Sequence, residues 1–135
     1  MSEEVISAEN VSKEMVKAVF DAALMETSYD QDGDIKVVER CKCFVRVDKE
    51  RRKIGMMTFF RFKPGVSEAA KLQCANQINN GYIMVRALVK DNALIFTYDI
   101  PLDGGISRMH LVKLVKRFCN IPHDAVADFG RETVE

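Results

Sequence analysis

The chain has 135 residues, of which 47% are hydrophobic and 30% charged, and its 20 basic and 20 acidic residues cancel. This length suits one domain with a single core, and the composition excludes disordered and fibrous proteins. Because the net charge is zero, no overall field attracts the chain to nucleic acid or to an anionic membrane. We therefore expect neither of these as a partner.

The N-terminal segment MSEEVISAEN is acidic and polar, unlike a signal peptide, and no stretch approaches 18 consecutive apolar residues. We expect a cytoplasmic protein whose cysteines stay reduced and mostly buried. The cysteines are Cys41, Cys43, Cys74 and Cys119. A single domain is expected over residues 1–135, with a core of about 11–122 between two flexible tails.

The first half of the chain predicts one helix followed by three strands. Ser12 caps a helix whose apolar stripe runs from Val16 to Leu24, and the helix is expected to end near Thr27. Strands are expected at residues 34–38, 41–47 and 54–62, with the charged sequence DKERRK as the tip of a hairpin. On the third strand, Met57 and Phe59 alternate with the residues of the opposite face.

The second half predicts a helix, a hairpin and a final helix. Ser67 begins a helix that ends near residue 80, the two strands lie at 83–89 and 93–100, and Ser107 caps the last helix. One short turn is expected after it, in the segment that begins at Ile121. The order α-β-β-β-α-β-β-α indicates an α+β fold, an antiparallel sheet with helices on one face.

The sequence YDQDGDIKVVE, residues 29–39, has the alternating aspartates of a calcium loop. The match is partial, because Ser28 stands at the first ligand position, Lys36 introduces a cation, and the following segment has strand character. A turn in which Asp30 and Asp32 bond their own backbone, with a positive dihedral at Gly33, is the favoured interpretation. A weak cation site that includes Asp34 stays open.

No other motif indicates metal or catalytic chemistry. Cys41, Cys43, Cys119 and His123 could form a zinc set, but the first two share one strand face, and one residue between them is fewer than structural zinc sites use. His110 is not next to a nucleophile, and no glycine-rich phosphate loop is present. We expect no enzyme and no cofactor.

Several segments together resemble the YbjN-like family, whose members are labelled bacterial sensory transduction regulators. They are CFVRV, MMTFFRF, SEAAKLQCANQINNGYIMVRALV, ALIFTYDIPLDGGI and LVKLVKRF, and the resemblance runs from about Val16 to Phe118, most of the chain. The resemblance implies a type III secretion chaperone-like fold, and chaperones of that fold are commonly dimers that hold a client segment. It implies no catalytic residues.

The sequence therefore predicts one of two functions. The first is a non-enzymatic interaction module, chaperone-like or regulatory, that acts as a homodimer and binds an unknown protein through exposed apolar surface. Its candidate residues are Met57 and Phe59 on the third strand and Ala69, Ala70 and Cys74 on the second helix. For the strand residues a competing interpretation is that tail residues such as Val126 and Phe129 cover that face of the sheet. The alternative is a small-ligand or ion sensor that uses the turn of Asp30, Asp32 and Asp34 or a pocket on the sheet.

Overall fold

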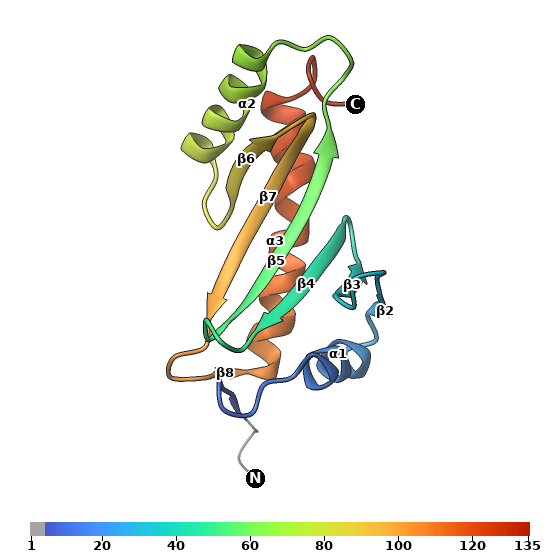
Figure 1. The fold of residues 1–135 in the computed structure, drawn as a ribbon, viewed down its shortest axis with the longest axis vertical. Helices are drawn as coiled ribbons and strands as arrows, with labels where there is room; N and C mark the ends of the chain where they lie inside the picture. Colours follow the sequence, from blue (N-terminus) through green and yellow to red (C-terminus); the bar gives the residue numbers. More distant parts are fainter. Residues whose placement is uncertain (1–4) are drawn as a thin grey trace.

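The computed structural model describes residues 5–135, and a six-stranded antiparallel sheet forms its centre (Figure 1). The spatial order of the strands is β2-β3-β4-β5-β7-β6. Their bounds are Glu26–Tyr29 for β2, Ile35–Val38 for β3, Lys42–Asp48 for β4, Lys53–Arg61 for β5, Arg86–Lys90 for β6 and Ala93–Pro101 for β7. The long strands β5 and β7 pair over their full length and form the spine of the molecule.

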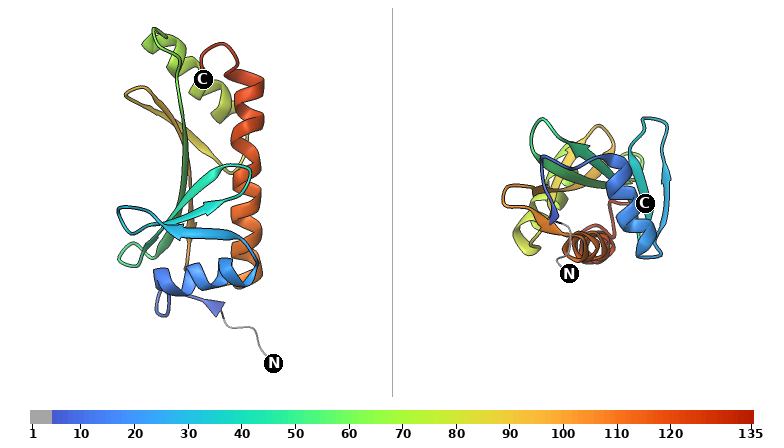
Figure 2. Two further views of the ribbon diagram at one scale, coloured as in Figure 1. Left: turned by 90° about the vertical axis from the view of Figure 1, so that its right-hand side faces the viewer. Right: turned by 90° about the horizontal axis from the view of Figure 1, so that it is seen from below.

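Three helices accompany the sheet. The longest helix, α3 (Arg108–Phe129), runs along one face of the sheet. The shorter helices α1 (Lys13–Ala22) and α2 (Glu68–Gly81) pack near the two ends of α3 (Figure 2). Each helix begins at the predicted serine, because the side chains of Ser12, Ser67 and Ser107 accept hydrogen bonds from backbone N–H groups three positions on. The predicted α+β fold is confirmed, and none of the helices within residues 5–135 is long and apolar enough to cross a membrane.

The alternation read from the sequence decides which side chains enter the core. Along β5, Ile54, Met56 and Thr58 are buried beneath α3, which contributes Val115 and Phe118 to the same core. All four cysteines are free and buried. We call this covered side of the sheet its inner face.

The end of the first helix differs from the prediction. The helix stops at Ala22, and Leu24 is 94% exposed with a φ of 62°, so its expected place on the buried stripe is wrong. The chain turns there, Met25 enters the core, and residues 26–29 form β2 as an edge strand that the sequence did not predict. The apolar spacing of a helix continues through this turn, which is why the pattern overestimated its length.

The end of the last helix also differs. In place of one short turn after residue 120, α3 continues to Phe129 with Pro122 inside it. Ala125 and Pro122 are buried, and Val126 and Phe129 pack against the core. Apolar burial over two further turns thus outweighs the hydrogen bond that proline removes.

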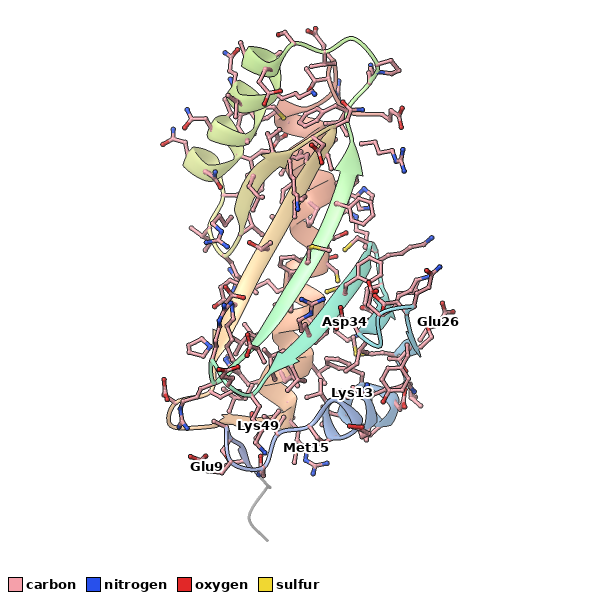
Figure 3. All side chains as sticks on the ribbon, in the orientation of Figure 1. Glu9, Lys13, Met15, Glu26, Asp34 and Lys49 are labelled. Carbon is pink, nitrogen blue, oxygen red and sulfur yellow. The ribbon has the colours of Figure 1, made fainter. Side chains whose placement is uncertain are left out.

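Both ends of the described chain make contacts. Residues 1–4 lie outside the described part, but β1 (Val5–Ile6) pairs with β8 (Ile106–Ser107), and Ile6 is fully buried. Lys49, in the turn between β4 and β5, donates a hydrogen bond to the carbonyl of Glu9 (Figure 3). At the other end, Val134 is buried and bridges to Phe62. These buried residues lie outside the expected core of 11–122.

Candidate functional site

The face of the sheet opposite α3 carries an apolar centre that none of the described elements covers (Figure 2). Met57 and Phe59 are 36% and 47% exposed there. Phe44 on β4 stacks on Phe59 with ring centroids 6.2 Å apart. We define the outer face by the side chains Lys36, Phe44, Met57, Phe59, Arg86, Leu88, Ile95 and Thr97.

The strand register arranges these side chains in rows across the sheet. Lys36 pairs with Phe44, Phe44 with Met57, Met57 with Thr97 and Thr97 with Arg86, so one row crosses five strands with a cation at each end. The next row joins Phe59, Ile95 and Leu88. Cross-strand neighbours of this kind have Cβ atoms about 5 Å apart, so each row is a continuous surface.

Gly55 opens a hollow of about 270 Å³ beside the first row, lined by Phe44, Met57 and Thr97 among others. Gly55 lies between Arg46 and Asp99 in the register and has no side chain to fill the space. A second hollow, of about 500 Å³, lies toward β4 and α3 and includes Lys36, Lys42 and Phe59 in its lining. The outer face is therefore uneven, with depressions on both sides of the half-buried Phe44 and the exposed Phe59.

Several acidic groups near the outer face are already paired. Asp34, at the start of β3 (Figure 3), forms a salt bridge of 2.9 Å with Arg46, and the hydrogen bond between them raises the pKa of Arg46. Asp99 pairs with Lys53 at 3.1 Å. These pairs neutralise the part of the face around Gly55.

The remaining candidate residues belong to α2, which packs against β6 at the edge of the sheet, whereas Met57 and Phe59 belong to β5 (Figure 1). Ala69 is exposed and Ala70 is half-buried, whereas Cys74 points into the core beside Thr133. Leu72, which the sequence did not single out, is 53% exposed on the same helix. The five candidate residues therefore do not form one surface.

The aspartate turn adopts the geometry of the favoured interpretation. The carboxylate of Asp30 accepts hydrogen bonds from the backbone N–H groups of Asp32 and Asp34, both at 2.9 Å, and Gly33 has a φ of 84°. The Asp34 carboxylate is held by Arg46. Two of the three carboxylates are thus engaged within the protein.

Three of the four residues of the possible zinc set come together, but the histidine does not complete it. The Cys119 thiol lies beside those of Cys41 and Cys43 under α3. His123 instead contacts the carbonyl of Arg40 through Nε2 at 2.9 Å and packs on the ring of Phe60. Within residues 5–135, no group of histidine, cysteine and acidic side chains has the geometry to hold a metal ion.

The fold is that of a class of small α+β proteins which includes type III secretion chaperones. A crystal structure of YbjN from E. coli, described as a "putative transcription regulator", superposes with a TM-score of 0.77 at 9% identity over 98% of this chain and 99% of that one. The Yersinia pestis type III secretion chaperone SycH, solved with a fragment of YscM2, gives 0.55 at 12% identity over 85% and 97%. The HopA1–SchA chaperone–effector complex gives 0.54 at 11% identity over 82% and 92%.

The chain belongs to the YbjN family, whose model matches residues 12–130 and is described as "Putative bacterial sensory transduction regulator". The resemblance noted from the sequence is therefore confirmed. No curated protein matches the chain. At 9–12% identity, the structural likenesses establish the fold alone.

The sequence indicated Met57 and Phe59 but missed the row in which Met57 lies. Lys36 and Arg86 are 50 positions apart in the chain, and only the register of five strands brings them into one line. Their positions on alternating strands were a weak signal, because a cation on an exposed strand face is usually only solvated. The outer face is the candidate functional site.

Proposed function

We propose that the chain is a non-enzymatic protein-interaction module of chaperone-like or regulatory type, that it acts in the cytoplasm, and that its outer face binds a protein partner. The observation that carries this proposal is the exposure of Met57 and Phe59 next to Phe44 at the centre of one face of the sheet. Contiguous exposed apolar side chains with a polar rim are typical of protein-binding surfaces. Methionine adapts its shape to different contacts, which suits such a surface.

Affinity capture from the native cytoplasm with gentle cross-linking tests this proposal. The wild-type protein is compared with a Met57→Ser and Phe59→Ser double variant, after circular dichroism has established that the variant is folded. A matched control replaces Leu24 and Met109, which are 94% and 60% exposed outside both the outer face and α2. We expect a stoichiometric partner with the wild type and the control that is lost with the outer-face variant. Equal recovery with all three would overturn the proposal.

We further propose that residues 1–135 act as one domain and form a homodimer through α2. The small side chains of Ala69 and Ala70 permit close approach of a second copy, and the exposed Leu72 adds apolar area nearby. Cys74 supports this surface from within the core. Ala70→Glu is expected to give a monomer by light scattering, whereas Ala18→Glu, on the exposed side of α1, should leave the dimer intact. An unchanged dimer with Ala70→Glu would contradict this interface.

A further inference from the structure

Some of the basic side chains on and beside the outer face have no partners of their own. Within the described residues, no hydrogen bond, ion pair or ring contact engages the side chains of five of them. They are Lys36, Lys42, Arg61, Arg86 and Lys90. Asp91 lies beside Arg61 and Lys90, and Glu26 lies in the row of Lys42, so the local excess of positive charge rests mainly on Lys36 and Arg86.

These cations lie around the apolar centre and not within it. Lys36 and Arg86 end the row that contains Phe44 and Met57, and neighbouring strands about 4.8 Å apart place their backbones about 19 Å from each other. Arg61 and Lys90 lie in a further row, joined through Ala93, beyond Phe59 and Ile95. A ligand that covers the centre therefore meets positive charge at its sides and at one end.

From this arrangement we propose that the outer face binds an acidic amphipathic segment of a partner protein. Apolar side chains of the segment pack on Phe44, Met57 and Phe59, while its aspartate or glutamate side chains reach Lys36 and Arg86. Charge complementarity at the rim of an apolar patch speeds association and selects the partner, and the apolar centre supplies most of the affinity. This inference rests on the proposed function and adds the chemistry of the partner.

A nucleic acid fits the same face less well. A single strand carries a phosphate at every nucleotide and needs cations along its whole path, interleaved with the aromatic side chains on which bases stack. The first row instead places only Phe44, Met57 and Thr97 between its two terminal cations. An anionic bilayer would attract the same cations, but binding to a bilayer does not require apolar side chains arranged in one row between them.

Selection from a displayed library of random 16-residue peptides tests the proposed chemistry with the full-length protein. The baits are the wild type, a Lys36→Glu and Arg86→Glu variant, and a Lys113→Glu and Arg117→Glu control. The control makes the same change of charge at exposed positions of α3, on the other side of the molecule. Because all four side chains lack partners in the described structure, both variants are expected to remain folded.

The wild type and the α3 control should enrich peptides in which acidic residues alternate with large apolar ones. The outer-face variant should bind these peptides roughly tenfold more weakly, since two favourable surface charge pairs become repulsive. That variant should also enrich basic peptides in their place, a reversal that loss of folding would not produce.

The inference would be overturned by enrichment of neutral or basic peptides by the wild type, by equal binding of the acidic peptides by both variants, or by no enrichment. Tighter binding of an oligothymidylate or of phosphatidylserine vesicles than of the selected peptides would also overturn it. The proposed function fails separately. Suppose that capture from the cytoplasm is lost with Met57→Ser and Phe59→Ser but unchanged with Lys36→Glu and Arg86→Glu. The outer face then binds a protein partner, but the bound segment is not recognised by its acidic side chains.

Discussion

Strand β5 shows the difference between the two faces of the sheet within nine residues. Ile54 and Met56 point inward and are almost completely buried, whereas Met57 and Phe59 point outward and keep a third to a half of their surface exposed. The two sets have similar hydrophobicity, so composition does not separate them. What separates them is that α3 covers one face and no described element covers the other. An apolar side chain on the covered face stabilises the fold, and one on the open face is available for contact.

The largest effect should follow a change on the covered face. Phe118 on α3 is fully buried against the inner face. Phe118→Ala removes its apolar contacts and leaves a cavity, so the free energy of unfolding should fall by about 3–5 kcal/mol. Urea unfolding followed by circular dichroism measures this loss. A fall below 1 kcal/mol would mean that α3 is not closely packed on the sheet.

The buried thiols should make the inner face sensitive to high pH. A hydrogen bond with Cys119 and burial raise the pKa of Cys41 far above the value of 9.0 for a free thiol. The contact with Cys41 lowers the pKa of Cys119, but the contact with Cys43 and burial outweigh it, so this pKa is raised as well.

Because the folded pKa values are raised, this stability is present below pH 9 and is lost as the pH rises above it, when only the unfolded thiols ionise. The loss should be about 1–3 kcal/mol between pH 8 and pH 10. Unfolding curves at both pH values check this, and the Cys41→Ala and Cys119→Ala variant should show a shallower dependence. If the free energy of unfolding of that variant depends on pH as strongly as that of the wild type, the thiols are not the cause of the dependence.

The edge of the sheet at β6 should show an intermediate effect. Asn79 on α2 donates to the carbonyl of Ala87 at 2.9 Å and accepts from its N–H at 2.7 Å, which closes this edge to further strands. Asn79→Ala leaves both backbone groups of a buried residue without these partners, so a loss of about 2 kcal/mol is expected. Amide hydrogen exchange at Ala87 should accelerate. Unchanged exchange would show that the side chain does not protect the edge.

The smallest effect on stability should be on the open face. Met57→Thr keeps a side chain with good strand propensity and removes only the covered part of a side chain that is 36% exposed, so the free energy of unfolding should fall by less than about 1 kcal/mol. Urea unfolding beside the wild type measures it. A loss as large as that expected for Phe118→Ala would mean that the two faces do not differ in the way described.

How far the sequence predicted the molecule depends on whether a feature is local. The serine caps and the alternation along β4 and β5 involve neighbouring residues, and they were predicted correctly. The continuation of α3 past Pro122 depends on packing against the sheet, and a local rule for proline fails there. The β2 strand needed the turn at Leu24, whose φ of 62° no apolar spacing reveals.

The candidate site likewise has local features that the sequence predicted and non-local features that it did not. Exposure of Met57 and Phe59 followed from alternation and from having too few helices to cover two faces. The row from Lys36 to Arg86 depends on the register of five strands and could not be read from spacing. Cys74 was expected at a surface because small residues surround it, but its position on α2 turns it toward Thr133.

Site-specific photo-crosslinking in living cells tests the central claim most directly, namely that the open face of the sheet binds a protein partner. A benzophenone amino acid is placed at position 57 or 59 and, as a control, at position 109 on α3, where Met109 is 60% exposed. We predict a covalent adduct with another polypeptide from positions 57 and 59 and none from position 109. An adduct from position 109 alone, or from no position, would contradict the assignment of function to this face.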